Sequence, residues 1–238
     1  MRIHVLQHVP FEDAANIGVW ACERGLSLTR TRLYLDEPLP GIQQIDWLVI
    51  MGGPMNVYEH ERFPWLVTEK QYISRAIETR RFVLGICLGA QLIADCLGGR
   101  VTANAHREIG WFDVSLTPEA VGGSLLGCLP ERFEAFHWHG DTFAMAPQAR
   151  LLAASSACAH QAFQFDDHVL GMQFHLDYAQ DSIAKMVDRC SDELTSGPFV
   201  QTDAGVLIDR EKAESLKKYL YVLLDHCLAR RFPSLLGE

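Results

Sequence analysis

The chain has 238 residues, 48% of them hydrophobic and 21% charged, which is typical of a globular protein rather than a disordered or fibrous one. Its 21 Lys and Arg against 30 Asp and Glu give a formal charge of −9, and this acidic balance argues against binding to nucleic acid or to an anionic membrane. The length is enough for one or two domains, and we expect one.

The beginning of the chain, residues 1–8, lacks the apolar run and the small-residue cleavage site of a secretory signal. No later segment has the ~18 consecutive apolar residues of a membrane span, so we expect a cytoplasmic protein. The seven cysteines are scattered, odd in number and without a CxxC pair. This pattern predicts reduced, mostly buried thiols rather than a disulfide framework or a zinc ribbon.

Apolar runs alternate with stretches of helical periodicity along the first hundred residues. We expect strands at residues 3–9, 29–35, 47–51, 82–87 and 101–103. We expect helices at residues 12–24, 63–80 and 88–97. Strands that are apolar at every position are typical of a parallel sheet with helices on both faces. The sequence therefore predicts an α/β fold with its reactive groups at the carboxyl ends of the strands.

Beyond residue 107 the pattern changes to short strands separated by turn residues. These strands are expected at residues 111–116, 132–138, 151–155, 162–165 and 169–174, and they predict an antiparallel extension of the sheet. Two helices are expected at residues 179–194 and 210–229. We assign residues 1–178 to one domain and residues 179–238 to a helical extension packed on it.

The second of these helices carries an apolar stripe with helical spacing. Its members are Leu216, Leu220, Leu223, Leu224, Cys227 and Leu228. Such a stripe most simply packs on the domain, and a docking face for a partner subunit is the alternative interpretation.

The motif GICLG, residues 85–89, lies where an apolar strand gives way to a helix. A nucleophile at such a turn sits in a strained backbone, and flanking glycines avoid clashes there. The start of the following helix favours the thiolate form of Cys87. The motif therefore predicts a cysteine nucleophile, with a buried structural cysteine as the alternative.

A second strand ends in the sequence GMQFHLD, residues 171–177. If this strand neighbours the one before Cys87, His175 lies at the same sheet edge and can act as the acid and base. Residues two apart in an extended segment share a face, so Asp177 can orient the imidazole. Taken alone, a histidine after a strand is more often structural.

Two further segments suggest parts of a site. The strand before Met51 ends in Gly52-Gly53-Pro54, which is either a tight turn or a loop whose N–H groups face an oxyanion. His137 and His139 would share one face of a strand, but no further ligand at a usual spacing completes a metal set, so we expect no metal there.

Five segments in succession resemble the class I, triad-type glutamine amidotransferases. They are VIMGGPMNVYE, VLGICLGAQLIADCLGGRV, HREIGWFDV, FHWHGDTF and LGMQFHLD. The resemblance extends over residues 3–177, and stand-alone proteins similar to the glutaminase domain of GMP synthase are the most similar members. It implies a flavodoxin-like sheet, with residues 1–178 as the amidotransferase domain and no cofactor.

The resemblance also implies a mechanism in which Cys87 attacks the side-chain amide of glutamine, forming a glutamyl thioester and releasing ammonia. His175 would be the acid and base, with Asp177 as its orienter. The remaining implied roles are oxyanion donors at Gly53 and Leu88, and substrate contacts at Gln91, Phe136, His137 and Trp138. The segment His106–Glu108 is either a solvated hairpin tip or a part of the site near the substrate.

One residue departs from the family pattern, which usually ends in His-Pro-Glu or His-Leu-Glu. Here Asp177 takes the place of Glu, and its side chain is shorter by one methylene, on the order of 1.5 Å. We therefore expect a long or water-bridged contact to His175 and a less strictly oriented imidazole. A Cys–His pair tolerates a weaker third member because the thiol is acidic.

The chain lacks the GxxxxGK[ST] phosphate loop of an ammonia-using synthase. The expected partners are therefore glutamine or another γ-glutamyl compound, a separate ammonia-accepting synthase subunit, and a second copy of the chain in a homodimer. Two alternative functions stay open, a γ-glutamyl hydrolase on the same scaffold and a non-catalytic regulatory or binding module.

Overall fold

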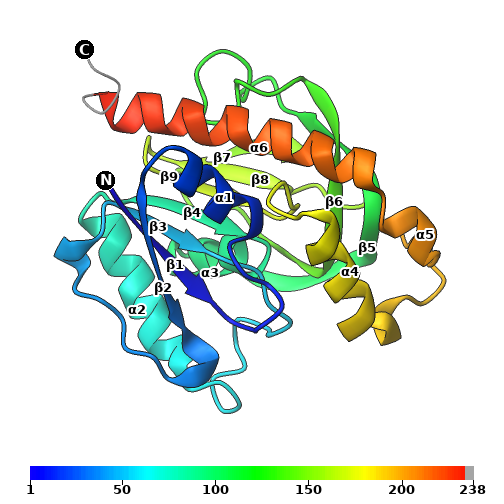
Figure 1. Ribbon diagram of the computed structural model, residues 1–238, viewed down its shortest axis with the longest axis horizontal. Helices are drawn as coiled ribbons and strands as arrows, with labels where there is room; N and C mark the ends of the chain where they lie inside the picture. Colours follow the sequence, from blue (N-terminus) through cyan, green and yellow to red (C-terminus); the bar gives the residue numbers. More distant parts are fainter. Residues whose placement is uncertain (234–238) are drawn as a thin grey trace.

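A computed structural model describes residues 1–233 of the chain (Figure 1). One group of strands is parallel and lies in the centre and on one side of the sheet. Its members are β1 (Arg2–Gln7), β2 (Ser27–Arg32), β3 (Trp47–Ile50), β4 (Phe82–Ile86) and β9 (Val169–Met172). The order β2-β1-β3-β4-β9 is that of a flavodoxin-like sheet. The predicted fold class is therefore confirmed.

The other strands extend this sheet by antiparallel pairing, also as predicted. They are β5 (Val101–Leu116), β6 (Arg132–Phe143), β7 (Arg150–Ala154) and β8 (Ala162–Phe165), in the order β9-β8-β7-β5-β6. The two strands expected at 101–103 and 111–116 form one strand, β5, because pairing with β6 resumes after an irregularity between Ala103 and Glu108. The segment His106–Glu108 is therefore a part of β5 and not a hairpin tip, although His106 and Arg107 are exposed as that interpretation expected.

Helices cover both faces of the sheet (Figure 1). One face carries α1 (Ala15–Glu23), α4 (Gln180–Arg189), α5 (Ala204–Leu207) and α6 (Arg210–Arg231). The opposite face carries α2 (Trp65–Glu78) and α3 (Leu88–Cys96). Short 3₁₀ turns occur at Leu33–Leu35, Ile42–Gln44 and Ser191–Glu193. Within residues 1–233 none of the helices combines the length and the apolar composition that crossing a bilayer requires.

The central strands are apolar at every position because each of their faces contacts a different core. Val49 and Leu84 pack toward α1 and α6, whereas Leu48 and Val83 pack toward α2 and α3. All residues of β3 and β4 are buried. Because both faces of β4 are packed, the strand cannot shift along its neighbours, and the position of the residue that follows it is fixed.

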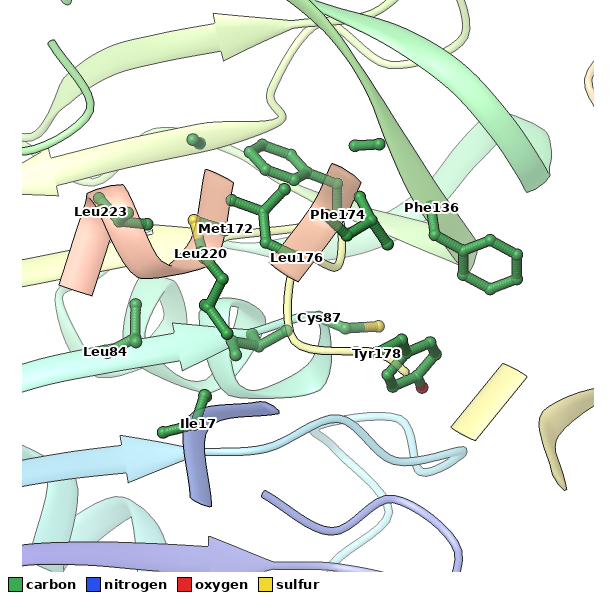
Figure 2. Close-up of a cluster of buried hydrophobic side chains, with 14 of the residues drawn as sticks. Ile17, Leu84, Cys87, Phe136, Met172, Phe174, Leu176, Tyr178, Leu220 and Leu223 are labelled. Atoms are coloured by element: carbon green, nitrogen blue, oxygen red, sulfur yellow. The ribbon is translucent and has the colours of Figure 1, made fainter. Parts of the chain in front are cut away.

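The apolar stripe of α6 is buried against the sheet, which confirms the packing interpretation. Figure 2 shows Leu220 and Leu223 of α6 in the same cluster as Leu84 and Met172. The two helices expected in the extension thus pack on the main sheet, and residues 234–238 of that extension lie outside the described residues. The boundary at residue 178 stays a prediction.

Each of the seven cysteines carries a free thiol. Four are buried, as expected for most of them, while Cys22 is exposed and Cys96 and Cys128 are partly buried. Only Cys87 lies in the turn between a strand and a helix.

Candidate active site

Cys87 occupies a sharp turn between the last residue of β4 and the first residue of α3. Its backbone has φ 52° and ψ −110°, in a region that L-residues rarely adopt. The turn is tight because α3 lies close to β3: a Cβ on Gly89 would be 2.1 Å from the carbonyl oxygen of Ile50. Only glycine fits at residue 89, so the GxCxG spacing is a packing requirement of this turn.

The Cys87 thiol faces polar groups from two other strands. It donates to the carbonyl oxygen of Trp138 at 3.7 Å, and the Gln173 amide donates to the sulfur at 3.5 Å. The side chain is buried but opens into a cavity. Because Cys87 immediately precedes the first turn of α3, the free N–H groups of the helix favour a negative sulfur.

His175 lies beside Cys87 because β4 and β9 are adjacent and parallel, with Ile86 opposite Met172. The strand before His175 is thus a neighbour of the strand before Cys87, as the prediction for His175 required. The His175 backbone N–H donates to the carbonyl oxygen of Phe136 at 2.8 Å, and the imidazole stacks on Tyr178 with ring centroids 4.0 Å apart. These contacts fix the ring with its Nδ1 toward Asp177.

Asp177 reaches the imidazole directly: its Oδ1 lies 3.1 Å from Nδ1 of His175, within hydrogen-bond range. The expected long or water-bridged contact is therefore wrong, because the chain after β9 brings the two side chains together. Burial opposes a charge on His175, but Asp177 and the Cys87 thiol outweigh it and raise the pKa of His175 to about 10. The site thus favours an imidazolium facing the sulfur.

The cavity above Cys87 has a volume of about 390 Å³. The turns that follow the parallel strands, the helix α3, the antiparallel strands β5 and β6 and the 3₁₀ turn at Ser191–Glu193 all line it. The lining residues include Glu12, Gly53, Cys87, Gln91, Arg107, Trp138, His139, Asp141 and Glu193. Gln91 is held by a hydrogen bond from its amide to Gln173 at 3.0 Å.

Two of the residues predicted to contact substrate lie away from this cavity. Phe136 and His137 are fully buried and do not line it, and the Phe136 ring packs edge-on against Trp111. The carbonyl of Phe136 instead holds the His175 backbone. Trp138 lines the cavity, and its carbonyl oxygen accepts a hydrogen bond from the Cys87 thiol.

Glu12 is a member of the site that the sequence interpretation missed, since we expected it inside a helix. The helix α1 begins only at Ala15, and the Glu12 carboxylate is buried in the cavity wall, where it accepts from the Tyr178 hydroxyl at 3.0 Å. Burial raises its pKa, although His175 and Tyr178 oppose that effect. Its only sequence signal is its place just after β1, at the edge where the parallel strands end.

A buried polar cluster lies behind the antiparallel wall. Glu108, His137 and His139 bring three metal-ligand atoms within 4.8 Å of one another. Glu108 joins the two histidines because β5 pairs with β6 at His139, which the spacing of the histidines alone does not predict. Imidazole and carboxylate ligands suit Zn²⁺, whereas the Gln161 amide, which donates to Glu108 Oε2 at 2.6 Å, favours a hydrogen-bonded network.

Comparison with known proteins points to one family. Residues 19–188 match the family described as glutamine amidotransferase class-I. The glutamine amidotransferase-like protein YfeJ of Salmonella typhimurium is 33% identical over 198 residues, 82% of this chain and 83% of that protein. The glutamine-hydrolyzing GMP synthase of Thermomicrobium roseum is 32% identical over 162 residues, 65% of this chain and 29% of that synthase. A crystal structure of a glutamine amidotransferase from Thermotoga maritima superposes with a TM-score of 0.86 at 29% identity, covering 97% of both chains.

Proposed function

Because the chain belongs to the class-I glutamine amidotransferase family, we propose that it hydrolyses the side-chain amide of glutamine through a thioester on Cys87. The observation that carries the proposal is the strained turn that presents Cys87 beside His175, with Asp177 3.1 Å from the far nitrogen of the imidazole. An inert buried cysteine needs neither the strained backbone nor the base.

The reaction begins when the Cys87 sulfur attacks the amide carbon and the C=O electrons move to the oxygen. The N–H groups of Gly53 and Leu88 stabilise the resulting oxyanion. His175, which holds the thiol proton, gives it to the nitrogen as the C–N bond breaks, and ammonia leaves. Water then attacks the thioester with His175 as base, which releases glutamate and restores the thiol.

The substrate is held by groups on both sides of the sulfur. Gln91 and the Trp138 backbone contact the glutamine, and both line the cavity. Phe136 and His137 act indirectly, because Phe136 positions His175 and His137 supports the strand that carries Trp138. Asp177 orients His175 by accepting from Nδ1.

The ammonia is consumed by a separate synthase subunit. One similar protein is a glutamine-hydrolyzing GMP synthase, of which the match covers 29%, so the rest of that synthase has no counterpart in the match. The present sequence contains no GxxxxGK[ST] loop for a nucleotide phosphate.

A larger γ-glutamyl compound is the second candidate substrate. The cavity of about 390 Å³ falls in the range that holds drug-sized ligands, so it has room for a group attached beyond the γ-amide. The two candidates differ only in the amine that leaves.

The test is to incubate the protein with glutamine and with γ-glutamyl amides and to compare kcat/KM. We expect glutamate and ammonia in equal amounts, and an acid-quenched glutamyl adduct on the peptide that contains Cys87. Cys158→Ala is a matched control, since this thiol is buried in the connection between β7 and β8 and contacts Thr142. Turnover of γ-glutamyl amides alone would move the assignment to a γ-glutamyl hydrolase. Absence of both turnover and adduct would support a non-catalytic module.

A further inference from the structure

Both ring nitrogens of His8, in the turn after β1, face hydrogen-bond acceptors. Nδ1 lies 2.9 Å from the carbonyl oxygen of Gly52, and Nε2 lies 2.8 Å from Oε1 of Glu69 on α2. A neutral imidazole carries one N–H and can satisfy only one of these acceptors. Both contacts are satisfied when the ring is doubly protonated, as an imidazolium paired with the Glu69 carboxylate.

The pair is enclosed on every side. The side chains of His8 and Glu69 are both fully buried, and the Trp65 ring lies 5.5 Å from the imidazole. The other charged group that faces His8 is Glu12, and beyond Gly52 lie His175 and Cys87. Burial opposes the charge on His8, but Glu69, the Gly52 carbonyl and Glu12 outweigh it and raise the pKa of His8.

The carbonyl that His8 holds belongs to the same peptide unit as the N–H of Gly53. No peptide bond within the described residues is cis, so the Gly52 oxygen and the Gly53 hydrogen point in opposite directions in one plane. With the carbonyl held toward His8, the N–H points away from it, toward the cavity that Gly53 lines with Cys87. Within residues 1–233 this N–H has no hydrogen-bond partner.

Gly53 itself cannot adjust its position freely. A Cβ at this residue would lie 2.9 Å from Cβ of His8 and 3.0 Å from Cδ2 of Leu88, so the peptide is packed between the imidazole and the start of α3. Leu88 supplies the other free N–H at that helix start. The peptide that carries one proposed oxyanion donor is thus packed between His8 and the residue that carries the other.

We propose that His8 and Glu69 form a buried positioning pair that fixes the Gly52–Gly53 peptide so that its N–H faces the oxyanion. This inference rests on the proposed function, because it assigns a task to a peptide that acts only when an amide is attacked. His8 is a positioning residue, since it contacts the peptide and not the substrate.

The charge on His8 controls the peptide, because a ring that has lost one proton can no longer donate to both acceptors. The remaining proton stays on Nε2, facing the Glu69 carboxylate, and the lone pair of Nδ1 then faces the Gly52 oxygen. This repulsion releases the peptide, so the wild-type protein should lose kcat as His8 deprotonates at alkaline pH. The loss adds to any loss from His175, whose pKa is about 10.

Three variants separate these effects. Asn places an amide N–H near the position of Nδ1, so His8→Asn should keep the bond to Gly52, whereas His8→Leu removes the donor. We expect His8→Leu to lower kcat by about 10²- to 10³-fold, as the loss of one oxyanion donor does, and His8→Asn to lower it by less than about tenfold. Glu69→Gln can donate to Nε2 of a neutral His8, so its kcat should lack the part of the alkaline decline due to His8.

Alkylation of Cys87 by iodoacetamide is the readout that separates positioning from general damage. The sulfur displaces iodide at an sp³ carbon, so no oxyanion forms, and the reaction needs the thiolate but not the Gly53 N–H. We expect iodoacetamide to alkylate Cys87 in His8→Leu at the wild-type rate, measured by peptide mass spectrometry. His4→Asn is the matched control: this buried histidine of β1 contacts Thr29 and Thr31, and its loss should leave kcat unchanged.

Equal kcat in His8→Leu and His8→Asn, or parallel losses of turnover and alkylation, would overturn the inference. If His8→Leu does not fold, the alkaline profiles of the wild-type protein and Glu69→Gln decide it, and identical profiles refute it. If the wild-type protein turns over no amide, the proposed function fails instead. In that case ¹⁵N NMR of the His8 ring tests the pair alone: protons on both nitrogens at pH 7 support it, and one proton contradicts it.

Discussion

His175 and His137 are both completely buried and lie in different halves of the sheet, yet their pKa values shift in opposite directions. Burial alone would lower both. At His175, in the parallel half, Asp177 and the Cys87 thiol raise the pKa to about 10. At His137, in the antiparallel half, Glu108 does not offset burial, and the pKa falls to about 4.

Two causes separate them: His139 and His175 oppose a charge on His137, and the two carboxylates are shared differently. Asp177 contacts one imidazole, whereas Glu108 Oε2 faces His137, His139 and the Gln161 amide together. A carboxylate divided among several donors stabilises a charge on any one of them less. The parallel half therefore holds a charge beside the thiol, while the antiparallel half holds a polar network that supports the cavity wall. Substitutions in each half test this division.

The largest expected effect distinguishes two of the buried thiols, Cys87 and Cys158. Cys87→Ala should reduce glutaminase turnover by at least about 10³-fold, because removing a nucleophile leaves only binding and oxyanion stabilisation. Cys158→Ala should leave kcat near the wild-type value while lowering the melting temperature. Turnover measured on both proteins checks this, and similar losses in the two would refute the division.

The second largest loss of turnover is expected for Asp177→Asn. The amide keeps the size of the side chain but not its charge, so the imidazole loses the partner that raises its pKa. We expect kcat to fall on the order of 10²-fold, less than the ~10⁴-fold loss in a serine triad, because a thiol needs less help to ionise. Unchanged turnover in this variant would exclude Asp177 as the third member.

Glu108→Gln is the corresponding change in the antiparallel half, and the opposite pattern is expected. The amide keeps one acceptor oxygen but has no charge and places an NH₂ donor in the buried network, which should lower the free energy of unfolding by about 2 kcal/mol. Turnover at neutral pH should fall less than about tenfold, since Glu108 acts only through the strand that carries Trp138. Urea denaturation and steady-state kinetics measure the two quantities. A turnover loss as large as that of Asp177→Asn would place Glu108 in the reaction.

The pH dependence of stability compares the two histidines directly. The folded pKa of His137 is below its unfolded value of ~6.5, so the free energy of unfolding should decrease as the pH falls from about 6.5 to about 4. The folded pKa of His175 is above it, so its contribution is complete below about 6.5 and is lost as the pH rises toward about 10. Each slope is at most about 1.4 kcal/mol per pH unit.

Urea titrations at several pH values check both signs. His137→Gln should flatten the acid side, leaving the part due to His4, whose pKa burial lowers to about 4. His175→Gln should flatten the alkaline side. An acid slope that His137→Gln does not change would show that this imidazole is not neutral in the folded protein.

Local sequence determined the elements around Cys87. An apolar run, two glycines and a helix-forming stretch fix a strand, a turn and a helix within residues 82–96, because every requirement lies within a few residues of Cys87. His175 and Asp177 were predicted in the same way, two residues apart after a strand. The segment 101–116 was predicted less well, because its continuation as one strand depends on pairing with a partner about 30 residues away.

The tertiary structure decided which of these local elements meet. It placed β4 beside β9, so that Cys87 faces His175, and it brought His8 to Glu69 across 61 residues of sequence. Neither Glu12, Glu69 nor Glu108 carries a local motif, because a buried carboxylate is defined by partners that only folding supplies. The sequence by itself therefore determined the type of fold and predicted the candidate reacting groups. The protonation of its buried histidines depends on charges brought together over long distances, which only the folded chain sets.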